Sequence, residues 1–144
     1  MGKRGRHIRD NTLKFLLSRL AERELEAVSD CLYFSSVCEN DYPELSVLFD
    51  GFGREHADNM KRIEKALLET KAECHLSVKA NINIVSDGDA CAMLKNLAER
   101  ESEDIILYEK LYLADKSGSF DAHLKEILRA SRVRLSILEN IQKT

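Results

Sequence analysis

Residues in the last part of the chain form a single stripe whose members are separated alternately by four and three positions. This spacing keeps the side chains on one face of an α-helix, where they can pack into a common core. The members are Phe120, Leu124, Ile127, Ser131, Arg134, Leu138 and Ile141. The pattern predicts a helix over 119–142, and it places Ser131 and Arg134 in the middle of the buried face.

Three earlier segments carry stripes of the same kind and predict helices over 10–39, 43–71 and 89–115. The stripes are Leu13, Leu17, Leu20, Glu24, Ala27, Cys31 and Phe34; Leu45, Phe49, Phe52, His56, Met60, Ile63 and Leu67; and Cys91, Leu94, Ala98, Glu101, Ile105, Tyr108 and Tyr112. With one proline and six glycines in 144 residues, the chain offers few breaks, which favours long helices over strands. The sequence therefore predicts an all-α protein.

The connections between the predicted helices differ greatly in length. Those around Asn40–Pro43 and Lys116–Ser119 are short, whereas residues 72–88 form a segment that can run the length of a bundle. Short connections make neighbouring helices antiparallel. We therefore expect a four-helix bundle of two antiparallel helical hairpins joined by one long crossover, folded as one domain over residues 10–144.

The start of the chain differs in charge from the remainder. We expect residues 1–9 to be a flexible basic tail. The whole chain has a formal net charge of -3, which predicts no nucleic-acid partner. No apolar run approaches the roughly 18 residues of a membrane span, so we expect no membrane partner and a cytoplasmic location. The basic residues of the tail are Lys3, Arg4, Arg6 and Arg9.

Each stripe carries a polar interruption near its middle. These interruptions are Glu24, His56, Glu101 and Arg134. Burying an unpaired charge costs several kcal/mol, so we expect the four side chains to meet in one shared polar site. The remaining acidic residues around Glu101, which are Glu99, Glu103 and Asp104, are expected on a solvated face.

The first helix requires a choice between Glu24 and Glu26. At about 100° per residue the two side chains point roughly 200° apart, so only one can face the bundle. Leu20, Ala27 and Cys31 share the face of Glu24. We therefore predict that Glu24 is the inward carboxylate.

With these positions assigned, the chain resembles the rubrerythrin branch of the ferritin-like superfamily over about residues 10–142. In that family two helices each give an inward glutamate, often followed seven residues later by tyrosine, and the other two each give Glu-x-x-His. The six side chains hold two iron ions. The motifs that carry the resemblance are Glu24-x-x-Ala27, Arg54-Glu55-His56-Ala57, and Glu101 followed by Tyr108 within Ile105-Ile106-Leu107-Tyr108.

The chain departs from the family pattern at the metal ligands. Gly53 stands where a glutamate is expected before His56, and Ser131-x-x-Arg134 stands where the second Glu-x-x-His is expected. Cys31 occupies the position commonly held by a tyrosine. Of the six expected ligands only Glu24, His56 and Glu101 remain. The resemblance therefore implies the ferritin-like fold without a full di-iron centre.

Arg134 suggests how the fold tolerates this loss. Two buried carboxylates repel each other when no metal lies between them. A guanidinium supplies a permanent positive charge and a planar fork of donors suited to carboxylates. We expect Arg134 to replace the metal charge between Glu24 and Glu101. The alternative is that Arg134 extends to the end of the bundle or to an oligomer interface.

These residues are compatible with two functions. The first is a non-catalytic scaffold or association protein that forms a homodimer or a higher homo-oligomer. The second is a rubrerythrin-type, peroxidase-like oxidoreductase with one Fe, Mn or Zn ion on Glu24, His56 and Glu101, aided by Cys31 or Asp104. In both cases we expect the site to be lined by Cys31, Gly53, Tyr108 and Ser131.

Overall fold

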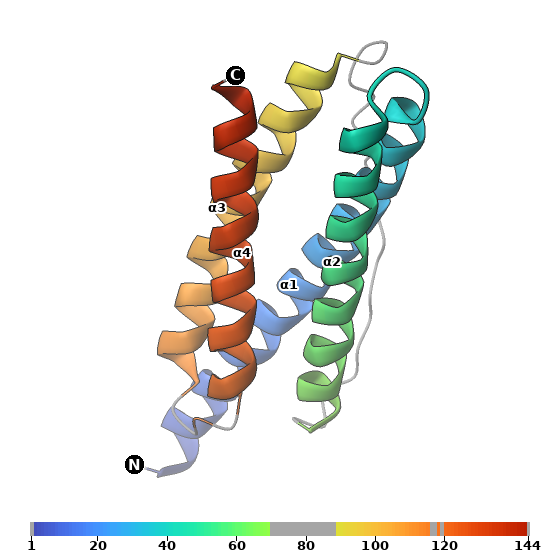
Figure 1. Cartoon of the computed structure of the whole chain (residues 1–144). Coiled ribbons are helices and arrows are strands. Elements are labelled where there is room, and N and C mark those ends of the chain that lie inside the picture. The colour runs from blue at the N-terminus through green and yellow to red at the C-terminus, as the bar shows by residue number, and fades with distance from the viewer. Residues whose placement is uncertain (1, 70–88, 116–117, 119, 144) are drawn as a thin grey trace.

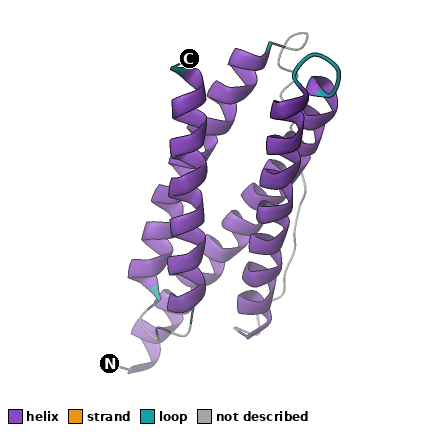
Figure 2. Ribbon diagram, in the orientation of Figure 1, coloured by secondary structure: helices purple, strands orange, loops and turns teal. Residues whose placement is uncertain are grey.

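The structure is a computed structural model, and it describes residues 2–69, 89–115, 118 and 120–143, with side chains from residue 12 onward. The described part consists of helices joined by turns and loops, and it contains no strand (Figure 2). Its helices are α1 (Gly2–Cys38), α2 (Pro43–Glu69), α3 (Ala90–Ala114) and α4 (Asp121–Gln142). The predicted all-α class and the four predicted helices are confirmed.

The helix ends differ most from the prediction at the start of the chain. The backbone of α1 is already helical at Gly2, so the predicted start at residue 10 is too late. The side chains of the predicted basic tail, residues 1–9, lie outside the described residues, as does the predicted crossover over 72–88. The start of α3 is capped by Asp89, whose side chain accepts hydrogen bonds from the backbone nitrogens of Cys91 and Ala92 at 3.0 and 3.3 Å. Such a cap satisfies donors that the first turn of a helix leaves unpaired.

The helices pack in a defined set of pairs. Close contacts join α1 to α2, α3 to α4 and α1 to α3, whereas α2 and α4 meet only sparsely. The α1–α2 connection lies at the upper end of the molecule in Figure 1, and α3 and α4 approach their shared connection at the lower end. Near the upper connection, the hydroxyls of Ser35 and Ser46 each donate to the other residue's carbonyl oxygen at 2.7 Å.

Two apolar clusters fill the interior, one toward each end of the bundle. The first includes Leu20 of α1, Ile63 of α2, Leu111 of α3 and Ile127 of α4. The second includes Phe34, Phe49, Leu97 and Leu138 from the same four helices. In every helix the polar interruption lies between its contributions to the two clusters. A polar layer is therefore enclosed by apolar layers on both sides.

The predicted stripes of α1 and α4 match the buried faces of those helices closely. In α3 the prediction is wrong at three positions, because Cys91 and Tyr112 are exposed and Ile105 is only half-buried. The buried face instead uses Met93, Asp104 and Leu111. In α2, Asn59 is buried where Met60 was predicted. Steps of three and four residues both preserve a helix face, so the stripe alone does not decide between adjacent positions.

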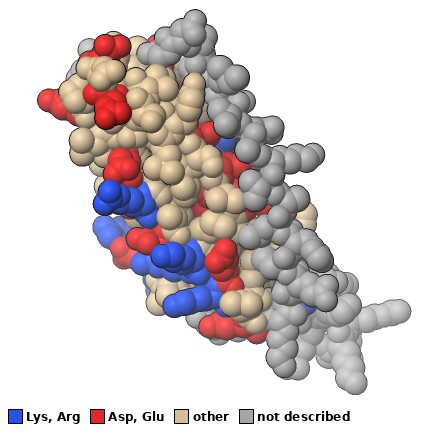
Figure 3. Space-filling model, turned by 90° about the vertical axis from the view of Figure 1, so that its right-hand side faces the viewer, with Lys and Arg blue, Asp and Glu red and all other residues tan. Residues whose placement is uncertain are grey.

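The surface carries charges of both signs. On the face shown in Figure 3, Lys and Arg side chains stand beside Asp and Glu side chains. None of the described helices contains a stretch long and apolar enough to cross a membrane.

Candidate functional site

The polar layer contains a group of side chains that we call the central cluster, contributed by all four helices. Every member is almost fully buried, with at most 3% of its surface exposed. Side chains buried to this degree must find their hydrogen-bond and charge partners inside the protein. The members are Glu24 of α1, His56 of α2, Glu101 and Tyr108 of α3, and Ser131 and Arg134 of α4.

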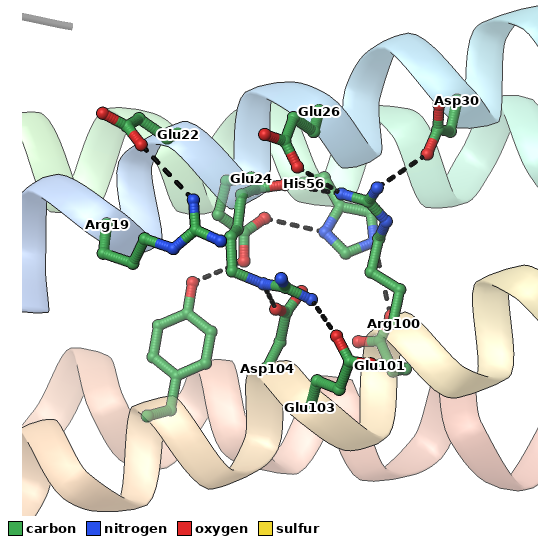
Figure 4. Close-up of polar contacts among 12 residues, drawn as sticks. Arg19, Glu22, Glu24, Glu26, Asp30, His56, Arg100, Glu101, Glu103 and Asp104 are labelled. Carbon is green, nitrogen blue, oxygen red and sulfur yellow. Dashed lines mark hydrogen bonds and ion pairs between the residues drawn. The ribbon is translucent and has the colours of Figure 1, made fainter. Parts of the chain in front are cut away.

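His56 lies between the two buried carboxylates. Its Nδ1 is 2.7 Å from Oε2 of Glu24, and its Nε2 is 3.5 Å from Oε2 of Glu101 (Figure 4). Burial alone would lower the pKa of His56, but Glu24 and Glu101 outweigh burial and raise the pKa to about 9. The imidazole is therefore protonated at neutral pH, with one N–H directed to each carboxylate.

Arg134 binds the second carboxylate. Its Nε and Nη2 lie 2.9 and 2.8 Å from the same oxygen, Oε1 of Glu101. Nη2 also donates to the hydroxyl of Ser131 at 3.0 Å, and Nη1 donates to Glu55 at 2.9 Å. Burial tends to raise the pKa of Glu101, but His56 and Arg134 together hold it below the usual range. Glu101 is therefore an ionised carboxylate held by two cations.

The first carboxylate has a neutral partner in place of arginine. Tyr108, which is fully buried, donates its hydroxyl to Oε1 of Glu24. Burial and the adjacent Glu24 raise the pKa of Tyr108 well above its ordinary value. Glu24 thus receives a phenol on one oxygen and the imidazolium of His56 on the other.

Cys31 and Gly53 lie beside the cluster, where α1 and α2 approach each other closely. A Cβ atom added at Gly53 would lie 3.4 Å from Cβ of Cys31. Burial, with Glu101 nearby, raises the pKa of the Cys31 thiol to about 12. The thiol is therefore neutral and unreactive in the folded protein.

Two further arginines flank the central cluster, and sequence reasoning did not find them. Arg23 of α1 pairs with Asp104 and, at 2.8 Å, with Glu103, both on α3. Arg100 of α3 pairs with Glu26 and Asp30 of α1, each at 3.1 Å (Figure 4). Each helix thus supplies one arginine to the acids of the other. We call these contacts the reciprocal pairs.

A repeated segment underlies the reciprocal pairs. Residues 20–26 read LAERELE and residues 97–103 read LAERESE, so they differ only at Leu25 and Ser102. In each copy the arginine binds the last glutamate of the other copy. Glu24 and Glu101 occupy the same position in the two copies, and both contact His56. This repeat is the signal that could have identified Arg23 and Arg100 from the sequence.

Asp104 is buried, contrary to the prediction from the sequence. It was expected on a solvated face, or as an extra metal ligand, but it is 1% exposed and paired with Arg23. Burial raises the pKa of Asp104 to about 6, against the opposing charge of Arg23. Glu103 does remain on the surface, where it accepts a bond from Arg23. The choice of Glu24 over Glu26 agrees with the structure, because Glu24 is 1% exposed and Glu26 turns to Arg100.

The buried charges balance without any added ion. Among the described residues, four acids have at most 3% of their surface exposed, namely Glu24, Asp30, Glu101 and Asp104. Four cations face them, namely protonated His56, Arg134, and the arginines Arg23 and Arg100, whose side chains are each 12% exposed. In a low-dielectric interior, such pairing offsets much of the cost of removing charges from water.

The three predicted metal ligands, Glu24, His56 and Glu101, therefore lie together, and their polar atoms contact one another directly. Within the described ranges, no three His, Cys, Asp or Glu side chains form a group that could hold a metal ion. Comparisons of the chain with protein-family models, with curated proteins and with solved structures gave no match.

Proposed function

We propose that this chain is a ferritin-like bundle in which an ionic cluster stands in place of a di-iron centre, and that it acts by association rather than by redox catalysis. The resemblance to the rubrerythrin branch supplies the first part of the proposal. The order of contacts along the helices supports it: α1 meets α2 at Ser35 with Ser46 and again at Glu24 with His56. The residue numbers of α1 fall along these contacts while those of α2 rise, as in an antiparallel hairpin.

The second hairpin is supported in the same way. Glu101 of α3 meets Arg134 of α4, and Glu109, farther along α3, meets Arg132, which comes earlier in α4. Two antiparallel hairpins joined by a long crossover are the connectivity of ferritin-like bundles. We propose this connectivity for the present chain.

The observation that carries the functional proposal is the use of His56. A metal-binding histidine offers a nitrogen lone pair, whereas both nitrogens of His56 face carboxylates and its pKa is raised to about 9. Arg134 occupies the remaining space beside Glu101 with a charge that cannot be removed. The residues present therefore do not fit a di-iron centre, and we derive no redox step through one.

A second function, a metal-dependent oxidoreductase with one Fe, Mn or Zn ion, is favoured by a single observation. Glu24, His56 and Glu101 lie within reach of one another. To bind an ion, His56 has to lose its proton and leave one of its two carboxylates. That step separates two close ion contacts in a buried site, which costs several kcal/mol.

Metal analysis distinguishes the two functions. The full chain is purified in chelator, and its thermal unfolding is compared before and after adding Fe(II), Mn(II) or Zn(II). We expect the unfolding midpoint measured in chelator to stay the same after each metal is added. Elemental analysis should find at most one ion per chain. Uptake of one ion per chain with a higher midpoint, or stoichiometric uptake of two irons, would overturn the proposal and favour the oxidoreductase.

A further inference from the structure

The outer side of α3 exposes large apolar residues although the helix is well packed on its inner side. Ile106, Tyr112 and Leu113 are 54%, 42% and 69% exposed. Ile106 and Leu113 lie seven residues apart, so they occupy one stripe along the helix. Exposed apolar residues scattered singly are ordinary, but a stripe of them beside a hollow indicates an interaction surface.

Such a hollow lies beside this stripe, in the groove between α3 and α4. It has a volume of about 340 Å³ and an almost wholly apolar surface. Its apolar lining comes from Tyr112, Leu113 and Leu128. At its rim stand Glu109 with Arg132, which form an exposed ion pair at 3.2 Å, and Lys125. We call the stripe and this hollow together the outer α3 face.

Charges along the stripe indicate what covers it. Glu109 and Lys110 lie midway between Ile106 and Leu113, and both are exposed. Lys110 forms no ion pair with any described residue. When two copies of α3 pack antiparallel about a two-fold axis between positions 109 and 110, Ile106 of each copy faces Leu113 of the other. The same axis sets Glu109 of each copy against Lys110 of the other.

A two-fold interface requires a surface that is complementary to itself, because the same patch is used on both subunits. The spacing along α3 meets this requirement in residue type and charge: Ile106 meets Leu113, and Glu109 meets Lys110. We propose that the outer α3 face is the surface through which two copies of this chain form a homodimer. Ile106 of each copy packs over Leu113 and toward the hollow of the other.

This inference rests on the proposal that the chain acts by association, and it names the partner. It does not depend on the central cluster, since its residues point away from Glu24, His56 and Glu101. Variants of the outer face therefore leave metal content unchanged, whichever function the metal analysis supports. A failed interface and a failed functional proposal are distinguishable on that basis.

Sedimentation velocity of the full chain over a range of concentrations tests the dimer. We expect Leu113→Asp to weaken dimerisation at least about 100-fold, because it buries a charge against Ile106 of the other copy. The matched control is Val47→Asp on α2, at a residue 74% exposed, which should alter the dissociation constant by no more than about twofold. Circular dichroism checks that both variants fold.

Charge reversal tests the pairing itself. Lys110→Glu sets Glu109 against a second glutamate and should weaken the dimer about tenfold. The double variant Glu109→Lys with Lys110→Glu restores opposite charges across the axis but loses the Glu109–Arg132 pair within each chain, so dimerisation should recover in part. A wild-type chain that stays monomeric, a dimer indifferent to Leu113→Asp, or a double variant no better than Lys110→Glu would each overturn the interface. A wild-type chain that stays monomeric and binds the dye anilinonaphthalene sulfonate in the hollow would also overturn the interface. It would indicate that the hollow takes a small apolar ligand.

Discussion

Arg134 of α4 binds one carboxylate oxygen of Glu101 on α3 through two nitrogens, Nε at 2.9 Å and Nη2 at 2.8 Å. The pair joins α4 to α3 in a site that is almost completely closed to water. A buried pair of this kind adds little stability relative to apolar residues, but losing one partner leaves an uncompensated charge.

Replacing Arg134 with Met should lower the free energy of unfolding by about 3–5 kcal/mol, because Glu101 is then left buried with His56 alone. Urea unfolding measures the change. The control is Arg129→Met on the same helix, where the side chain is 66% exposed and pairs with exposed Glu126. That change should have little effect on the free energy of unfolding, because water screens an exposed pair.

Both residues of the Arg134–Glu101 pair can be replaced by apolar residues at once. The double variant Arg134→Met with Glu101→Leu should recover much of the stability lost in Arg134→Met, since no charge remains unpaired at that contact. A double variant that is less stable than Arg134→Met alone would contradict this account of the pair.

Stability should fall as the pH rises through the titration of His56. Folding raises the pKa of this histidine from 6.5 to about 9. Its protonation therefore stabilises the folded state fully below pH 6.5, and this contribution is lost as the pH rises toward 9. We expect a loss on the order of 3 kcal/mol across this interval, measured by urea unfolding at a series of pH values.

Two variants separate this effect from other titrations. His56→Gln should be less stable than the wild type at neutral pH. Its free energy of unfolding should fall much less than that of the wild type between pH 6.5 and 9. His123→Gln, at an exposed position on α4, should keep the wild-type profile. An unchanged profile in His56→Gln would show that the decline arises elsewhere.

The cost of removing Arg23 should depend on pH because of Asp104. Folding raises the pKa of this acid from 3.8 to about 6. Stability from this group is therefore greatest when Asp104 is protonated, and it is lost as the pH rises through 6. Arg23→Met should cost about 3 kcal/mol near pH 8 and clearly less near pH 5, where Asp104 takes up a proton.

The background variant Asp104→Asn provides the internal control for this prediction. With no carboxyl to titrate, Arg23→Met should cost the same at both pH values. Arg19→Met, which removes a half-exposed arginine paired with Glu22, should have little effect at either pH. If Arg23→Met in the wild-type background lowers the free energy of unfolding equally at both pH values, Asp104 is not the group that titrates.

Metal binding should be recoverable by restoring one Glu-x-x-His. Ser131→Glu with Arg134→His removes the competing guanidinium and adds two ligands beside Glu101 and His56. We expect uptake of Fe(II) or Zn(II) to rise by about one ion per chain, measured by elemental analysis after dialysis. The same motif built on the exposed face of α4, as Arg129→Glu with Arg132→His, should bind no more metal than the wild type.

Much of the helical pattern is readable in the sequence itself. The four stripes predict four helices, and near the middle of each they place the residue that the structure buries: Glu24, His56, Glu101 and Arg134. This works because burial of an apolar face repeats with the period of the helix, so local spacing reports the core. The rejection of Glu26 as the inward acid follows from the same geometry.

Tertiary structure decided which other charged residues are buried. Asp30 and Asp104 lie three residues after Ala27 and Glu101, at positions compatible with the buried faces, but helix spacing alone does not show that an acid at such a position is buried. They are buried because Arg100 and Arg23 reach them from the opposite helix. The sequence alone determined the inward faces of α1 and α4 and the polar residue in the middle of every helix, whereas the burial of Asp30 and Asp104 depended on arginines 70 and 81 residues away in the chain. Desolvation is offset only where such a partner is close in space, and that proximity arises only when α1 and α3 pack together.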